Sequence, residues 1–248
     1  MDESSGASRR RIFLKQAAGL AGVAPLAPRL AASGAAVAVA LPAAAQGADA
    51  VPSPPAGYAS LSPDEATFVE ALVNVMCPAD ELTPSGVDCG IAVYIDRQLA
   101  GPFGKGDGRY MRGPFRQGKP QVGLQLAITP EAFFKAGVAA AAAACRRDRG
   151  KPFDQLAAAD ADAFLKDVQA GKVKDDKVVL ASWFNEVVYP LFVQGCFADP
   201  LYGGNQGKVF WKMIGYPGLP ATHSLDMVRY RGKAYPGAQS PKSIADFS

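Results

Sequence analysis

The sequence predicts a mainly α-helical protein: a single helical domain with long ordered Gly/Pro-rich loops, preceded by a cleavable leader. Three observations support this prediction. Apolar residues recur at helical spacing in several segments, residues suited to helix caps precede these segments, and alternating β patterns are scarce. The 248-residue chain contains 26 glycines and 20 prolines, so we expect long connections between the helices.

The N-terminal segment has the pattern of a twin-arginine export signal, which is two arginines, any residue, then Phe-Leu-Lys. Arg10 and Arg11 are the pair, and Phe13, Leu14 and Lys15 complete the pattern. The twin-arginine route carries proteins that have already folded. A protein usually needs it because the protein, or a partner folded onto it, acquires a cofactor in the cytoplasm.

The stretch that follows the twin arginines is typical of a leader. Residues 16–45 are dominated by small and apolar side chains, so we expect a leader peptidase to cleave after Ala45. A retained membrane anchor is the alternative, but a spanning helix needs ~20 mostly apolar residues, and Pro25, Pro28 and Arg29 interrupt this one. The predicted parts are a signal peptide (1–45), a Pro-rich tether (46–62) and a helical domain (63–248).

The excess positive charge of the chain lies in the leader. The whole chain has 26 basic and 23 acidic residues; residues 1–45 hold five and two of these, so the remainder carries 21 of each. A formally neutral domain without an arginine-rich stripe argues against nucleic acid or an anionic membrane as a partner.

The first two helices of the domain follow the tether. Ser62 is suited to cap a helix that has Pro63 at its first position, and Pro78 ends that helix. Apolar residues at helical spacing predict a second helix over residues 88–99.

The middle of the domain predicts two more helices. Thr129 caps an Ala-rich helix that extends to about Arg147, and its alanines permit close approach of another helix. A further helix starts at Asp154 or Ala159 and ends near Gly171.

The last third of the chain predicts one long helix, one short helix and a tail. Asp175 begins the long helix, and Pro190 should kink it or mark its last turn. Asn205 is suited to cap a short helix over Gln206–Ile214. The tail from Leu219 is polar and shows no helical period.

Residues 100–129 form a long connection crowded with glycine and proline. Such a segment inside a domain is usually functional or disordered. Its aromatic and basic side chains argue against disorder and favour contact with a partner. These side chains are Phe103, Tyr110, Arg112, Phe115 and Arg116.

All four cysteines, Cys77, Cys89, Cys145 and Cys196, follow the leader, and no pair forms a Cys-x-x-Cys motif. Export to the periplasm permits disulfides, and Cys77 with Cys89 is the most local pairing. Buried thiols are the alternative. The sequence leaves both open.

Motifs for catalysis are missing from the domain. His223 is the only histidine, so any Ser/His/Asp or Cys/His relay must use it. It lies in the tail, where an exposed or interface histidine is the simpler interpretation. One histidine and scattered cysteines also argue against zinc or iron–sulfur sites. Asp160 and Asp162 are more simply the start of a helix than a catalytic pair.

Nucleotide-binding motifs are missing as well. Glycines at 104, 106 and 108 follow no predicted strand, and no Walker A lysine pattern occurs. The run Tyr202-Gly203-Gly204-Asn205 could cradle an anion at a helix N-terminus, although a turn followed by a cap is the simpler interpretation. A folded-export signal on a domain without a cofactor motif points to a partner that carries the cofactor.

Four stretches of the domain occur in an order that identifies a family. The most specific is the Asp-Pro-x-Tyr-Gly-Gly-Asn run that starts at Asp199. The stretches are Gly90–Gly101, Gly113–Gly118, Phe197–Asn205 and Trp211–Gly218. With them, the chain resembles the gluconate 2-dehydrogenase subunit 3 family, the small (gamma) subunits of periplasmic flavoprotein dehydrogenase complexes.

The resemblance implies an accessory subunit with no cofactor and no catalytic residue of its own. In that family a large FAD-containing subunit oxidises a sugar or sugar acid, and a multihaem cytochrome c often passes the electrons to the membrane quinone pool. The large subunit commonly lacks an export signal. The resemblance therefore implies that this chain escorts it, folded, through the twin-arginine translocase, and that the complex is periplasmic and membrane-associated.

The resemblance also implies which residues serve the partner. The expected docking loop is formed or supported by Asp199, Tyr202, Gly203, Gly204, Asn205 and Trp211. The aromatic and basic side chains of the 100–129 connection give a second expected contact patch, which consists of Phe103, Tyr110, Phe115 and Arg116. Two alternatives remain: a stand-alone enzyme that uses His223 or a bound metal, and a periplasmic structural or ligand-binding protein without a flavoprotein partner.

Overall fold

The computed structural model describes residues 57–109, 111–115 and 127–247. The chain divides into two units, Met1–Ser53 and Pro54–Ser248, and all described residues belong to the second. The predicted export signal, with Arg10, Arg11 and Lys15, and the predicted cleavage site lie outside the described residues.

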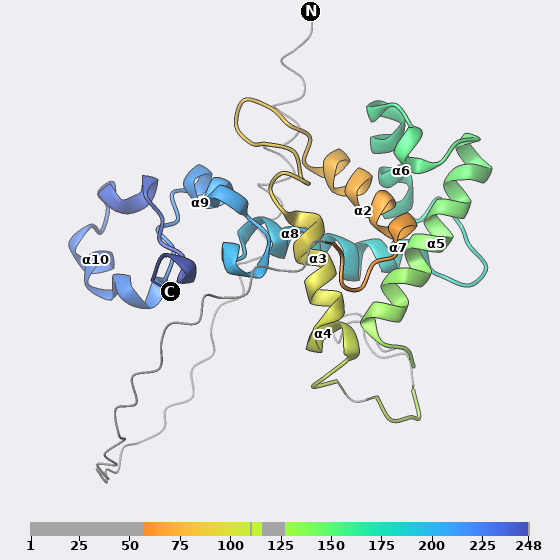
Figure 1. Ribbon diagram of the computed structural model, residues 1–248, viewed down its shortest axis with the longest axis horizontal. Coiled ribbons are helices and arrows are strands. Elements are labelled where there is room, and N and C mark those ends of the chain that lie inside the picture. Colours follow the sequence, from red (N-terminus) through yellow and green to blue (C-terminus); the bar gives the residue numbers. More distant parts are fainter. Residues whose placement is uncertain (1–56, 110, 116–126, 248) are drawn as a thin grey trace, which may run out of the picture. The chain divides into compact units, whose positions relative to one another are not determined.

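The described residues are helical and contain no β-strand, which confirms the mainly α prediction (Figure 1). Short 3-10 turns separate several of the helices. The α-helices are α2 (Pro63–Met76), α3 (Ile91–Ala100), α4 (Pro102–Lys105), α5 (Pro130–Arg149), α6 (Ala158–Gln169), α7 (Leu180–Trp183), α8 (Tyr189–Phe197), α9 (Val209–Ile214) and α10 (Ser224–Arg229). None of these helices is both long and apolar enough to span a bilayer.

Helix α2 begins at the predicted cap. The Ser62 side chain accepts a hydrogen bond from the Glu65 backbone N–H, and the Glu65 carboxylate accepts one from the Ser62 N–H, which is a complete capping box. Helix α3 begins at Ile91, three residues later than predicted. Gly90 adopts a left-handed backbone, with φ of 75°, and therefore delays the start of the helix.

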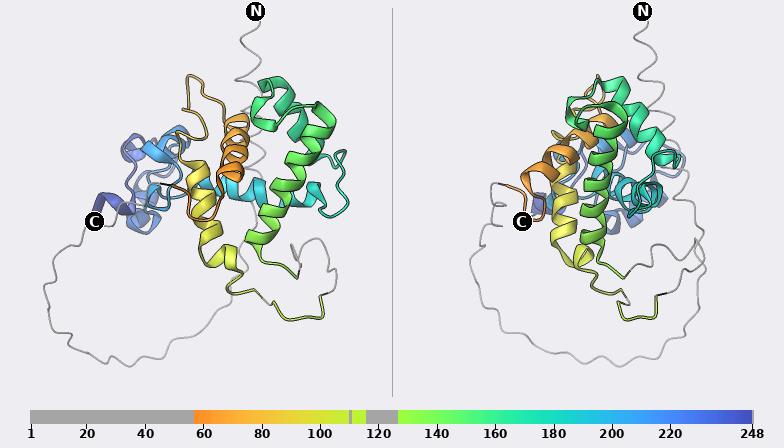
Figure 2. Two further views of the ribbon diagram at one scale, coloured as in Figure 1. Left: turned by 45° about the vertical axis from the view of Figure 1, so that its right-hand side comes forward. Right: turned by 90° about the vertical axis from the view of Figure 1, so that its right-hand side faces the viewer.

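Helices α2, α3 and α5 lie side by side, and α7 packs against α5 (Figure 2). The contact between α5 and α7 is close because Gly137 faces the Trp183 ring: a Cβ on this glycine would lie 2.0 Å from the indole Cδ1. The Trp183 indole N–H donates to the Phe134 carbonyl oxygen at 3.0 Å, so the ring is both packed and hydrogen-bonded. Thr129 caps α5 as predicted.

The long helix of the last third starts later than predicted. The Asp175 carboxylate accepts hydrogen bonds from the N–H groups of Lys177 and Val178, both at 2.9 Å, and so closes a turn instead of opening a helix. Helix α7 begins at Leu180, and Val179 is 69% exposed although the helical spacing placed it on the apolar face.

Pro190 does not mark the last turn of this helix. Helix α7 passes into a π-helical segment, Phe184–Val188, and then into α8, which continues to Phe197. The Tyr189 N–H bonds to the Phe184 carbonyl across the wider π turn. A proline removes one helical hydrogen bond and crowds the preceding turn, and the wide turn just before Pro190 accommodates it.

Residues 57–62, which belong to the predicted tether, are fixed to α3 by Asp96. This carboxylate is 2% exposed and accepts three backbone hydrogen bonds, from Ala59 at 2.7 Å, Ser60 at 2.8 Å and Leu61 at 2.9 Å. A buried charge needs such partners. Residues 57–62 of the predicted tether are therefore part of the folded domain.

Glu131 joins the same 57–62 segment to α4 and α5. Its carboxylate accepts hydrogen bonds from the Ser60 hydroxyl and the Lys105 ammonium and forms an ion pair with Lys135. These donors, Lys105 first, lower the pKa of Glu131 to about 2. Protonation of this carboxylate at low pH therefore weakens contacts between three parts of the fold.

The tail from Leu219, predicted to lack helix, contains short helical turns. They are Pro220–His223, α10, Pro236–Gln239 and Ile244–Phe247. Each is closed by local backbone bonds, such as that from Tyr230 N–H to the Asp226 carbonyl at 2.8 Å. These turns are too short for an apolar period to show in the sequence.

Replacing Gly137 with alanine should destabilise the protein by about 1–3 kcal/mol, because the new methyl group collides with Trp183. At an exposed helix position the same change would stabilise by about 1 kcal/mol, so the sign of the effect is diagnostic. Urea unfolding measures it, with Ala143→Ser, exposed on the same helix, as the control. A gain of stability in Gly137→Ala would contradict this packing.

Stability should fall as the pH drops from about 4.5 to about 2, because the pKa of Glu131 is lowered from 4.5 to about 2 in the folded chain. The stabilisation is complete above the unfolded pKa and is lost as the folded carboxylate becomes protonated. Glu131→Gln should flatten this part of the pH profile of the melting temperature. Glu186→Gln, at an exposed position, is the control, and an unchanged profile in Glu131→Gln would contradict the assignment.

Candidate functional site

The predicted docking residues 199–211 lie in the connection from α8 to α9 and in the first turn of α9. We call this segment the 199–211 loop. It lies against α3: a Cβ on Gly203 would approach Arg97 at 3.0 Å and Val93 at 3.1 Å, and one on Gly90 would lie 2.1 Å from the Gly203 carbonyl oxygen. The structure thus brings together two of the stretches that carry the family resemblance, Gly90–Gly101 and Phe197–Asn205.

Asp199 forms hydrogen bonds both with the start of the loop and with the C-terminal turn Ile244–Phe247. One carboxylate oxygen accepts a hydrogen bond from the Leu201 N–H at 3.0 Å and caps the 3-10 turn Pro200–Tyr202. The other accepts from the Ile244 N–H at 2.8 Å. An ion pair between Lys208 and Asp246 adds a second tie to the C-terminal turn.

Two of the loop's three glycines, Gly203 and Gly204, are required by backbone conformation and close contacts. Gly203 has φ of 102°, a conformation that disfavours a side chain, and its carbonyl accepts a hydrogen bond from the Gln206 side chain at 3.0 Å. A Cβ on Gly204 would lie 2.3 Å from the carbonyl oxygen of Gly195 in α8. Larger residues would force the loop away from α8.

Asn205 is fully buried and ties both ends of the loop together. Its amide nitrogen donates to the Ala198 carbonyl, and its amide oxygen accepts from the Phe210 N–H, each at 3.1 Å. The prediction that Asn205 caps a helix starting at Gln206 is therefore wrong. Residues Gln206–Lys208 form a 3-10 turn, and the Asn205 side chain reaches past it to the second residue of α9.

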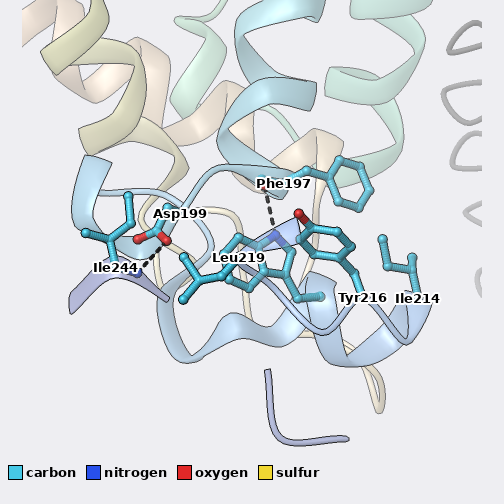
Figure 3. Close-up of a pocket in the computed structure, with 7 residues that line it drawn as sticks. Phe197, Asp199, Ile214, Tyr216, Leu219 and Ile244 are labelled. Carbon is cyan, nitrogen blue, oxygen red and sulfur yellow. Dashed lines mark hydrogen bonds between the residues drawn. The ribbon is translucent and has the colours of Figure 1, made fainter. Parts of the chain in front are cut away.

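Trp211 closes the loop onto the end of α8. Its indole N–H donates to the Phe197 carbonyl at 2.9 Å, and its ring meets Tyr216 edge to face at 5.2 Å. Beside this pair lies a mostly apolar cavity of about 440 Å³ (Figure 3). Its lining residues are Phe197, Asp199, Trp211, Ile214, Tyr216, Leu219 and Ile244.

The predicted docking residues divide by exposure. Gly203, Gly204, Asn205 and Trp211 are buried, so they shape the loop from inside the protein. Tyr202 is 49% exposed and presents its ring at the surface. Among the docking residues predicted in this loop, Tyr202 is therefore the exposed side chain that could touch another protein.

Arg97 and Cys89 also hold the loop, although neither is among the docking residues predicted from the sequence. The Arg97 guanidinium donates to the Leu201 carbonyl at 3.3 Å, and the Cys89 carbonyl accepts from the Gln206 N–H at 3.0 Å. Arg97 belongs to the stretch Gly90–Gly101, and Cys89 directly precedes it. The sequence offered one signal that these segments meet: the stretch Gly90–Gly101 and the loop both carry the family resemblance.

The second predicted contact patch is separate from this loop. Phe103 lies in α4, which contacts α3 and α5, and the Arg109 guanidinium carbon stands 5.6 Å from the centre of its ring. Phe115 is 40% exposed. Tyr110 and Arg116 lie outside the described residues.

His223 contacts Asp226 and Tyr235, with Nδ1 at 3.3 Å from the carboxylate and from the phenol oxygen. Asp160 lies in the first turn of α6, and Asp162 pairs with Lys166 on the same helix, as expected of a helix start. Within residues 57–109, 111–115 and 127–247, no group of three or more His, Cys, Asp or Glu side chains is arranged to hold a metal ion.

A comparison with protein-family models identifies the helical domain. The model described as gluconate 2-dehydrogenase subunit 3 matches residues 63–218, which include the helices α2 to α9 and the whole 199–211 loop. Comparisons with curated proteins and with solved structures found no match. The matched region ends before the C-terminal turns that begin at Pro220.

Replacing Asn205 with alanine should destabilise the protein by about 2–4 kcal/mol, because it leaves the Ala198 carbonyl and the Phe210 N–H without their buried partner. The exposed Asn185, whose side chain donates to the Gln169 carbonyl, provides a matched control, and its alanine variant should lose less than about 1 kcal/mol. Thermal unfolding compares the two. Equal losses would show that the Asn205 bonds do not hold the loop.

Proposed function

Because the chain belongs to the gluconate 2-dehydrogenase subunit 3 family, we propose that it is the non-catalytic small (gamma) subunit of a periplasmic dehydrogenase complex. Its partner is a large FAD-containing subunit that oxidises gluconate or a related sugar, with a multihaem cytochrome c as a further subunit. The chain binds the large subunit and directs its folded export. The family match over residues 63–218 is the observation that carries this proposal.

The geometry of the 199–211 loop supports a docking role. Buried side chains and close backbone contacts hold the loop rigid, so little conformational entropy is lost when a partner binds. Tyr202 stands exposed on this rigid support, and tyrosine is enriched among the residues that dominate binding energy. A lasting complex buries more than ~2,000 Å² in total, so further surface beyond this loop takes part.

The leader supports the escort role. Arg10, Arg11, Phe13, Leu14 and Lys15 match the signal of a route that exports folded proteins. A flavoprotein that has taken up FAD in the cytoplasm needs this route. One leader then serves both subunits, and the complex reaches the periplasm, where it associates with the membrane through its other parts.

Changing both arginines of the signal to lysine should abolish export of the large subunit when the two chains are co-expressed. The charge is retained, so the effect isolates the recognition of the arginine pair. Arg9→Lys, next to the pair, should leave export unchanged. The measurement is the flavin content and the large-subunit protein in the periplasmic fraction.

Export of the large subunit in full amount with the Arg10→Lys, Arg11→Lys variant would contradict the escort role. Retention of both subunits in the cytoplasm as an intact complex would support it. The complex is assayed in the cytoplasmic fraction by co-purification, so a failure of binding is separated from a failure of export.

A further inference from the structure

Two cysteine thiols lie close together at the two ends of the connection between α2 and α3. Cys77 follows α2 directly, Cys89 lies just before α3, and both are buried, at 6% and 0% exposure. Both sulfur atoms lie 3.7 Å from the same Pro84 carbonyl oxygen. The Cys77 thiol is near enough to Cys89 to be the main cause of the raised pKa of the Cys89 thiol.

The backbone around these cysteines fixes their approach. The Gly86 N–H donates to the Cys77 carbonyl at 2.8 Å, and the Cys89 N–H donates to the Ser85 carbonyl at 2.9 Å. A Cβ on Gly86 would lie 2.3 Å from the Val73 carbonyl oxygen, so the connection is pressed closely against α2. The contact between the thiols is therefore imposed by the fold.

We propose that Cys77 and Cys89 are a disulfide-forming pair that staples the connection between α2 and α3. The oxidant is a disulfide, such as the active-site disulfide of a thiol–disulfide oxidoreductase or oxidised glutathione. Two S–H bonds break and one S–S bond forms between the two cysteines. The oxidant accepts the two electrons and two protons and becomes a pair of thiols.

A disulfide between Cys77 and Cys89 would also restrict the backbone at Cys89 and Gly90, against which the 199–211 loop packs. The Cys89 carbonyl accepts the Gln206 N–H at 3.0 Å, and Gly90, the next residue, packs against the Gly203 carbonyl. Constraining Cys89 therefore constrains the backbone on which this loop rests. The proposal does not depend on the export role, since it concerns the chemistry of the folded chain.

Cys89 is a better partner for Cys77 than Cys196 is. Cys196 lies in α8, whereas Cys77 and Cys89 flank one short connection and both of their sulfur atoms lie 3.7 Å from the Pro84 carbonyl oxygen. The neighbouring Cys77 thiol, followed by burial, raises the pKa of Cys89, and burial raises that of Cys196. Because the thiolate is the reacting form, we expect slow formation of the bond in the folded chain and slow reduction afterwards.

Peptide mapping tests the pairing directly. The full chain is purified, incubated with a buffer of oxidised and reduced glutathione, alkylated with N-ethylmaleimide and cleaved after glutamate. Cleavage places each cysteine on its own peptide: 71–81 for Cys77, 82–131 for Cys89, 132–186 for Cys145 and 187–248 for Cys196. Trypsin cannot serve, because no Lys or Arg lies between Cys77 and Cys89.

The expected product is peptide 71–81 joined to peptide 82–131, lighter by two hydrogen atoms than the sum of the two and separated by reductant. The oxidised chain should also melt about 5–10 °C higher than the reduced chain. Cys145→Ser, which removes a thiol bonded to the Lys151 carbonyl, should retain the joined peptides, and Cys89→Ser should lose them. Alkylated or separately glutathionylated Cys77 and Cys89, or a link to Cys196, would overturn the proposal.

Discussion

The 199–211 loop depends on one buried side chain, the amide of Asn205. With one hydrogen bond to the residue before the loop and one to the start of α9, it fixes both ends of the loop at once. A buried amide without partners is unfavourable, so the loop closes around Asn205 in one arrangement. Asp199, Arg97 and Trp211 then attach this arrangement to the C-terminal turn, to α3 and to α8.

The proposed docking loop is shaped mainly by residues that are buried within it. Gly203 has a φ of 102° that disfavours a side chain, Gly204 allows a close approach to the Gly195 carbonyl, and the Trp211 indole bonds inward. Tyr202 is the exposed residue that we propose contacts the partner. In the proposed complex, binding of the flavoprotein and stability of the small subunit are thus two consequences of the same packing.

Several features that depend on neighbouring residues in the sequence could be predicted, although the turn closed by Asp175 was not, and features that depend on distant residues could not. The caps at Ser62 and Thr129 act within one helical turn, and both are confirmed. Asn205 caps no helix at Gln206 because its partners are set by the return of the chain to α8. The role of Asp96 was likewise hidden, since its three partners lie 35 to 37 residues earlier in the sequence.

Binding of the large subunit by Tyr202→Ala shows directly whether the exposed ring of Tyr202 holds the partner. The variant and the parent chain are each co-expressed with the FAD-containing partner, and the flavin retained per small subunit is measured after purification. We expect at least about a tenfold weaker complex for Tyr202→Ala with an unchanged melting temperature. Leu225→Ala, which is 83% exposed outside the matched region, should bind as the parent chain does. Full flavin retention by Tyr202→Ala would contradict this role of Tyr202.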